Sequence, residues 1–254
     1  MNIVENTYFE DIYQILQGRL RSAPDVHVGE WQAIKSDSMP QGDTIELEDV
    51  SFETQLPNNK TDWQLFVKPN LPWAEDHFLE RVSGEPLNPP PSSAWWPYAQ
   101  KNNSEFKADE KFSHTYPERF WPKSIIGNLQ TPDGLEDMVG IRYPWGDLLD
   151  VVHLLRNRPG TRQAYLPVWF PEDTGALEDQ RVPCSLGYHF LLRNGELKVV
   201  YYIRSCDLFR HFRDDVYMAG RLCQWVAEGI FARPGRLVMH ISSLHVFSAE
   251  RPLL

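Results

Sequence analysis

Apolar residues recur along this chain at two spacings, one typical of helices and one typical of strands. Near the N-terminus the helical spacing predicts an amphipathic helix ending near residues 18–22, with apolar positions Tyr8, Ile12, Ile15, Leu16 and Leu20. Three further segments carry helical patterns: Trp73 to Val82, Asp147 to Arg156 and Asp214 to Phe231. The second of these is apolar on more than half of its circumference, which predicts a largely buried helix.

Strand patterns dominate the C-terminal half. Leu186 to Leu192 and Leu197 to Ile203 are short β-type runs joined through Asn194-Gly195, the strongest short hairpin signal. Further strands are expected over 163–170 and 235–242. Residues 24–70 read as strands and loops, residues 89–91 as an extended proline link, and residues 100–115 as a polar surface loop. With no repeat and no clear boundary, we predict one α+β domain spanning 1–254.

Composition narrows the possible functions. The 254 residues are 42% hydrophobic, with nine Trp and twenty Pro, so a core and aromatic pockets are expected. The net charge of −10 argues against broad binding to nucleic acid, which needs a basic face. Three scattered cysteines predict neither disulfides nor a metal centre. No apolar run approaches membrane-spanning length, and the N-terminal residues are acidic and lack the apolar stretch of a secretory signal, so we expect a cytoplasmic protein.

The candidate chemistry lies between Arg181 and Phe247. Cys184 follows a proline at the start of a predicted strand, and a thiolate there could add to C6 of a pyrimidine ring and make C5 nucleophilic. An isolated cysteine in such a place is more often a small buried apolar residue. Cys206 and Cys223 have no supporting neighbours and are interpreted as structural.

Arg204-Ser205 is a candidate phosphate site, because a guanidinium and a hydroxyl suit a dianion. An arginine at the end of a strand is otherwise a common surface ion-pair partner. The Asn194-Gly195 turn returns this strand toward Cys184, which favours the functional interpretation.

These residues have the order and spacing of a known family. Cys184 after proline, Arg204-Ser205, Phe212-Arg213-Asp214-Asp215 and Ser243-Leu244-His245-Val246 resemble the thymidylate synthase family, and most closely its phage deoxycytidylate (dCMP) hydroxymethylase branch. The resemblance covers residues 115–250 well and 1–114 loosely. It implies a three-layer fold with a large mixed sheet flanked by helices, and a homodimer.

Asp215 bears on which base is bound. It lies eleven residues after Arg204, where the synthases have an asparagine that reads uracil. Cytosine presents the reverse pattern, an N3 acceptor and a 4-amino donor, and a protonated carboxyl group can satisfy both. Alternatively, both Asp214 and Asp215 could stabilise a helix N-terminus, and we assign that role to Asp214.

The resemblance implies roles for further residues. Arg162 would reach the phosphate of the partner subunit, His245 would bind the sugar 3′-hydroxyl, and Asp207 and Trp95 would hold 5,10-methylenetetrahydrofolate. Tyr116 and a glutamate would assist catalysis, the candidates being Glu75 and then Glu80. The chain departs from the family pattern at Gln163, Ser185 and Phe247, and it ends seven residues after Phe247, where members continue into a tail that covers the folate.

The sequence therefore predicts a hydroxymethyltransferase acting on dCMP, in which water captures the activated carbon at an open site. Two alternatives remain. One is another enzyme on this scaffold: a methylase, a CMP hydroxymethylase, or a folate-independent enzyme using the Cys184 adduct. The other is a non-catalytic pyrimidine-nucleotide-binding homologue. Product analysis with and without folate, and Cys184→Ser, would separate them.

Overall fold

The computed structural model describes residues 2–4, 8–27, 43–97, 107–108, 110–122, 128–131, 134–137, 146–174 and 182–254. Its helices are α1 (Phe9–Arg21), α2 (Lys60–Val67), α3 (Trp73–Arg81), α4 (Tyr116–Phe120), α5 (Leu148–Asn157), α6 (Pro171–Thr174) and α7 (Phe212–Gly229), with 3-10 turns η1 (Pro91–Ala94) and η4 (Ser248–Leu253). Its main strands are β1 (Asn2–Val4), β2 (Asp25–Val26), β3 (Thr44–Gln55), β8 (Tyr165–Pro167), β9 (Ser185–Arg193), β10 (Glu196–Asp207) and β11 (Arg233–Phe247). Two small hairpins join β4 (Lys107–Ala108) to β5 (Lys111–Phe112) and β6 (Asn128–Thr131) to β7 (Gly134–Asp137).

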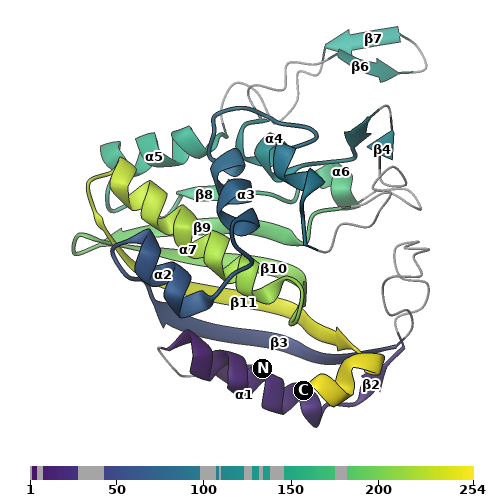
Figure 1. Ribbon diagram of the computed structural model, residues 1–254. Coiled ribbons are helices and arrows are strands. Elements are labelled where there is room, and N and C mark those ends of the chain that lie inside the picture. Colours follow the sequence, from purple (N-terminus) through teal and green to yellow (C-terminus); the bar gives the residue numbers. More distant parts are fainter. Residues whose placement is uncertain are drawn as a thin grey trace.

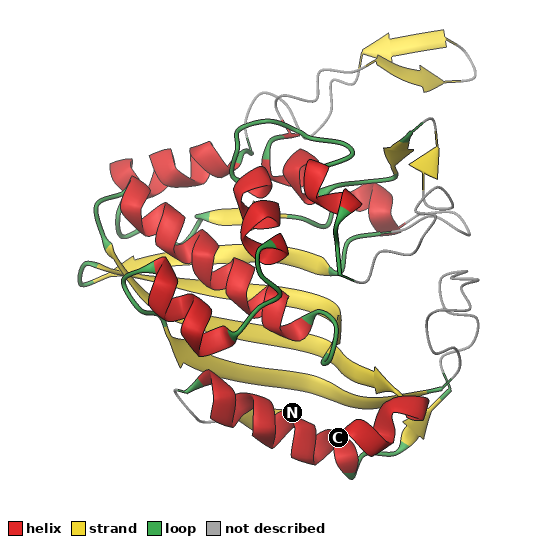
Figure 2. Ribbon diagram, viewed as in Figure 1, coloured by secondary structure: helices red, strands yellow, loops and turns green. Residues whose placement is uncertain are grey.

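One mixed sheet organises the molecule (Figures 1 and 2). Its strand order is β1-β3-β11-β10-β9-β8, and β2 pairs with β3. The β1–β3 and β10–β11 pairs are parallel, whereas the other neighbours are antiparallel. Helix α7 packs on β10 and β11, and α2 and α3 pack on α7. Sheet, α7 and outer helices are thus stacked in layers, and the prediction of an α+β fold is confirmed.

A tight hairpin determines where the strand ends meet. Asn194 and Gly195 both have positive φ, 52° and 75°, as a two-residue turn between twisted strands requires. The register set by this turn pairs Ile203 of β10 with Ser185 of β9. The backbone N–H of Arg204 then donates to the carbonyl of Cys184 at 2.9 Å. The sequence prediction that this hairpin returns Arg204 to Cys184 is confirmed.

The predicted helices are present, with α1, α3, α5 and α7 within a few residues of their expected bounds. Several other predictions were wrong. Residues 60–67 form a helix rather than strand or loop, because Asn59 caps it and Trp63 and Val67 bury one face. The last strand continues past Ser242 to Phe247, because β3 and β10 pair with it on both sides.

Two predictions of extended or buried structure also need correction. Pro91 begins a 3-10 turn, so the extended proline link ends at Pro90. Helix α5 buries only one face, with Leu148, Val151, Val152 and Leu155 inside, while Leu149 is 42% exposed. Half of the predicted 100–115 loop lies outside the described residues, and its described half includes β4 and β5.

The contact between α2 and α7 requires a glycine. The indole Nε1 of Trp63 donates to the carbonyl of Tyr217 at 3.0 Å, so the ring lies directly on the backbone of α7. A Cβ on Gly220 would lie 2.3 Å from that Nε1. We expect Gly220→Ala to lower the free energy of unfolding by about 1–3 kcal/mol, because the indole must move and lose its bond. Urea denaturation measures this. Gly18→Ala, in α1 with no atom within 4 Å of its Cβ, is the control and should not be destabilised.

Candidate functional site

Four of the predicted site residues line one cavity of about 220 Å³: Tyr116, Cys184, Ser205 and Asp215. The cavity lies between the start of β9, the end of β10 and the helices α3, α4 and α7. Its wall also contains residues that the sequence analysis did not select, among them Trp73, His77, Arg81, Ser92, Trp96 and His211. The structure therefore brings the proposed nucleophile and the proposed base-reading carboxyl group to the same space.

Arg204 fixes the segment that carries Cys184. Its Nε donates to the carbonyl of Pro183 at 2.9 Å and its Nη2 to the carbonyl of Val182 at 3.3 Å. Together with the backbone bond to Cys184, these contacts hold three consecutive carbonyl groups. Two guanidinium nitrogens are thus engaged in positioning the cysteine. Ser205, the next residue, is the member of the predicted phosphate pair that lines the cavity.

A tyrosine network supports the other side of Cys184. The Ser185 hydroxyl donates to the Tyr116 hydroxyl at 3.2 Å and shares a 2.6 Å bond with the Tyr201 hydroxyl. Tyr116 is the first residue of α4, whose N-terminus has a capping box between Thr115 and Glu118. Burial raises the pKa of Tyr116, so its phenol stays protonated at neutral pH.

Asp215 lies in the first turn of α7 and faces the cavity. Burial is the largest cause that raises its pKa to about 7; the charge of Arg81 opposes this increase and neighbouring Asp214 adds to it. The Cys206 thiol donates to Asp215 Oδ2 at 3.6 Å. Burial raises the pKa of Cys206 well above its ordinary value, so that thiol is not a nucleophile. Asp215 is therefore a carboxyl group that is partly protonated near neutral pH.

This pKa shift predicts a pH-dependent stability difference. Well below pH 4, Asp215 is protonated in both the folded and the unfolded state and does not lower the free energy of unfolding. Between pH 4 and 7 the unfolded carboxyl ionises first, so folded stability falls as pH rises, and above pH 7 the loss is complete. We expect Asp215→Asn to be a few kcal/mol more stable relative to wild type at pH 8 than at pH 4. Urea midpoints at both pH values measure this, and equal differences would contradict it.

Glu75 is not brought to the cavity. Its carboxylate accepts from Tyr217 Oη at 2.6 Å and from Arg221 Nε at 3.1 Å, and it forms a 3.2 Å ion pair with Lys60. Burial would raise the pKa of Glu75, but the bonds from Arg221 and Tyr217 leave it lowered. Its contacts join α3 to α7. Glu80 instead binds Ser92, which lines the cavity, through the backbone N–H at 2.6 Å and through the hydroxyl.

The two residues predicted to hold folate do not form such a site. Asp207 is 5% exposed, and its carboxylate accepts from the N–H groups of Phe209 and Arg210 and from Arg210 Nη1 at 2.8 Å. Trp95 is 47% exposed and lies outside the cavity wall. The neighbouring Trp96 lines the cavity and stacks on His211, with ring centroids 5.4 Å apart. The donor set implied by the resemblance is therefore not assembled here.

The remaining predicted binding residues also lie off the cavity wall. His245 is 5% exposed, and burial lowers its pKa. It pairs with Asp207 across the β10–β11 ladder. Arg162 is exposed, and its carbonyl accepts from His189 Nε2 at 3.0 Å. Neither residue lines the described cavity.

Arg81 is the charged residue that sequence reasoning missed. It is 4% exposed, its guanidinium carbon lies 3.9 Å from the ring centroid of Tyr116, and its Nε has no hydrogen-bond partner among the residues that the structure describes. It lines the cavity, and within the described ranges it forms no ion pair with a carboxylate. At the end of an ordinary amphipathic helix, Arg81 gives no sequence signal. Its burial depends on how α4 covers α3.

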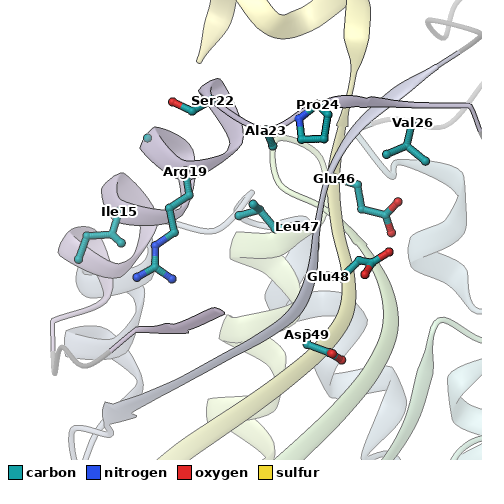
Figure 3. Close-up of a pocket in the computed structure, with 11 residues that line it drawn as sticks. Ile15, Arg19, Ser22, Ala23, Pro24, Val26, Glu46, Leu47, Glu48 and Asp49 are labelled. Atoms are coloured by element: carbon teal, nitrogen blue, oxygen red, sulfur yellow. The ribbon is translucent and has the colours of Figure 1, made fainter. Parts of the chain in front are cut away.

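A larger open concavity of about 920 Å³ lies elsewhere, between α1 and β3 (Figure 3). Arg19 of α1 and Glu46, Glu48 and Asp49 of β3 line it, and none of the predicted site residues does. Among the described residues, no group of His, Cys, Asp and Glu could hold a metal ion. The described helices include none with the length and apolarity needed to cross a membrane.

Comparisons with known proteins agree with this geometry. Residues 142–253 match the family model described as thymidylate synthase. A thymidylate synthase of Listeria monocytogenes (serotype 4b, strain F2365) is 21% identical over 204 residues, covering 79% of this chain and 62% of the relative. A deoxyuridylate hydroxymethyltransferase of Bacillus phage SP01 is 30% identical over 152 residues, covering 58% of this chain and 37% of the relative. The chain thus spans less than two thirds of the length of either relative.

Proposed function

We propose that this chain is a transferase of the thymidylate synthase and hydroxymethylase family that adds a one-carbon unit to C5 of a pyrimidine nucleotide, with dCMP as the preferred substrate. The observation that carries the proposal is the shared cavity of Cys184 and Asp215. A nucleophile for C6 and an acid for the cytosine edge are the two groups this substrate requires. The SP01 relative, named for hydroxymethyl transfer to deoxyuridylate, supports a hydroxymethyl product.

The nucleotide would be held at both ends. With its pKa near 7, the protonated Asp215 donates to cytosine N3 while its carbonyl oxygen accepts from the 4-amino group. Ser205 would contact the phosphate, helped by Arg162 of a second subunit in a homodimer. Sγ of Cys184 then forms a bond to C6, and the electron pair of the C5–C6 double bond makes C5 nucleophilic.

The carbon donor expected from the family is 5,10-methylenetetrahydrofolate. The Asp207 carboxylate is bonded to Phe209 and Arg210, and the exposed Trp95 lies outside the cavity wall, so neither residue is placed to hold this group. Trp96 and His211 present a flat aromatic wall beside the nucleotide position instead. The residues of this chain supply the nucleophile and the contact to the base.

Tritium release from C5 tests the proposal. Enzyme is incubated with methylenetetrahydrofolate and with dCMP or dUMP carrying tritium at C5. Release from dCMP in preference to dUMP is the expected result, and mass analysis should identify the hydroxymethyl product. Release from dUMP alone would contradict the base assignment. Release from neither nucleotide would contradict the transferase proposal and leave a binding homologue.

A further inference from the structure

We propose that His77 is the base that moves the hydrogen of C5, and that Ser92 and Glu80 position it by fixing its proton on Nδ1. The inference rests on the proposed function, because it assigns a residue to one step of that reaction. It replaces the glutamate that the sequence predicted, since Glu75 is engaged with Arg221 and Tyr217. Its basis is a hydrogen-bonded chain from a carboxylate to the cavity wall.

The His77 ring is held firmly at the cavity. Its side chain is 12% exposed and lines the same space as Cys184 and Asp215. The ring stacks on Trp73, with centroids 5.0 Å apart and planes 16° apart. It meets Tyr116 edge-on at 6.4 Å. Packing on both neighbours restricts the imidazole to one orientation, as a group that transfers a proton requires.

Hydrogen bonds determine which nitrogen carries the proton. The Ser92 hydroxyl donates its hydrogen to Glu80 Oε2, and the Ser92 backbone N–H donates to Glu80 Oε1 at 2.6 Å. Having given its hydrogen to the carboxylate, Ser92 Oγ can only accept from His77 Nδ1, which lies 2.9 Å away. The proton of a neutral His77 therefore sits on Nδ1. Within the described part of the chain, no residue hydrogen-bonds to Nε2, so this nitrogen keeps its lone pair on a ring that lines the cavity.

The charges around His77 set its protonation state. Burial and then the positive charge of Arg81 lower its pKa to about 4, against the opposing effect of Glu80. These two charged groups belong to α3 itself, while η1 contributes Ser92 and α4 contributes the neutral Tyr116. The imidazole is thus a free base above pH 5. Once protonated, it is stabilised through Ser92 by Glu80.

Glu80 is suited to this supporting role. Burial would raise its pKa, but the bonds from His77 and Ser92 leave it lowered, so it stays ionised. The Ser92–Glu80 bonds join η1 to α3 and hold the turn beside the helix. Tyr116 is the other cavity group that could take part. Burial raises the pKa of its phenol, and its hydroxyl is engaged with Ser185, so His77 is the stronger candidate for the base.

Exchange of the C5 hydrogen with solvent needs no co-reactant. Sγ of Cys184 forms a bond to C6 of dCMP, and the electron pair of the C5–C6 bond takes a deuteron from solvent at C5. His77 Nε2 then removes the original C5 proton, the C–H pair re-forms the C5–C6 double bond, and Sγ leaves C6. The net result is exchange of C5 hydrogen with D₂O. This reaction separates proton movement from one-carbon transfer.

The experiment follows C5 exchange of dCMP in D₂O by NMR, with no folate present. His77→Gln keeps an N–H donor for Ser92 but has no basic nitrogen, and should lower the exchange rate about 100-fold or more. His77→Ala should lose as much activity and recover at least tenfold in added imidazole. Ser92→Ala and Glu80→Gln should lower the saturating rate about tenfold while the Kd for dCMP stays within twofold. His153→Gln, on the exposed face of α5, is the matched control and should behave as wild type.

The outcomes separate this inference from the proposed function. Exchange by wild type, its loss in Cys184→Ser and its retention within threefold in both His77 variants would overturn the role of His77 and leave the proposed function intact. No exchange by wild type from either dCMP or dUMP would overturn both. Melting curves and dCMP binding establish that each variant is folded. Loss without imidazole rescue, in a folded His77→Ala that binds dCMP, would also count against the inference.

Discussion

Cys184→Ser is expected to lower tritium release from C5 of dCMP by about 10⁴-fold or more, while dCMP still binds within a few-fold of wild type. A serine hydroxyl at the same position is protonated at neutral pH and far less nucleophilic than a thiolate. The binding contacts with Asp215 and Ser205 do not depend on the sulfur atom. The loss should therefore appear in the rate at saturating substrate.

The structure explains why one atom carries so large an effect. Cys184 is half-buried on the cavity wall, and Arg204 holds the carbonyl groups of Val182, Pro183 and Cys184. The following residue is fixed by Tyr116 and Tyr201 through the Ser185 hydroxyl. No other cysteine can substitute, because burial raises the thiol pKa of Cys206 and of Cys223.

Cys223→Ser is the matched control. This thiol donates to the carbonyl of Leu197 at 3.4 Å in the core, and burial raises its pKa to about 12. Serine can keep that bond, so tritium release should stay within about threefold of wild type. A Cys184→Ser protein that retains a tenth of wild-type release would rule out thiolate addition. One that keeps its biological activity without product would indicate a binding module.

The fold could be predicted where local and long-range signals agree. The Asn194-Gly195 turn fixed one register and thereby the meeting of Ser205 with Cys184. Helix α7 could be predicted from the sequence because its apolar stripe is long. Helix α2 could not be predicted, because its eight residues follow Pro57-Asn58-Asn59 and bury only Trp63 and Val67. Its stability comes from packing on α7, which a single sequence does not reveal.

Site residues could be predicted only where the backbone determines which way their side chains point. Successive residues of an α-helix are rotated by about 100°, so side chains two residues apart point to nearly opposite sides of the helix. In α3 this turns Glu75 toward Arg221 of α7 and His77 toward the cavity. A resemblance that places a glutamate on this helix cannot resolve a shift of two residues. Trp95 and Trp96 are adjacent residues after η1, yet only Trp96 lines the cavity while Trp95 is exposed.

Asp215→Asn is expected to reverse the choice of base. The amide oxygen of asparagine accepts from N3–H of uracil and its nitrogen donates to O4, the pattern that cytosine cannot match. Two hydrogen bonds change partners, each contributing about 1–3 kcal/mol when the mismatched group is left buried and unsatisfied. The ratio of kcat/KM for dCMP over dUMP should therefore fall by about 10³-fold. Tritium release from both nucleotides measures it.

The neighbouring carboxylate is the control for this substitution. Asp214 accepts from Asn70 N and Nδ2, both at 2.8 Å, so it holds the chain before α3 against α7. Asp214→Asn replaces one of the two oxygens that accept from Asn70 with an NH2 donor and should destabilise the protein. Its ratio of dCMP to dUMP activity should stay within about threefold of wild type. An equal change in both variants would show that helix α7 had shifted, and base reading would then not be specific to Asp215.

The pH dependence of activity tests the base-reading role of Asp215 independently. Because the pKa of Asp215 in the protein without nucleotide is about 7, the fraction of the protonated form that can donate to cytosine N3 declines above that pH. For wild type, kcat/KM with dCMP should fall about tenfold for each pH unit above 7. Asp215→Asn has no proton to lose there, and its activity on dUMP should lack this decline. A flat wild-type profile from pH 6 to 9 would mean that the carboxyl group does not read cytosine through a shared proton.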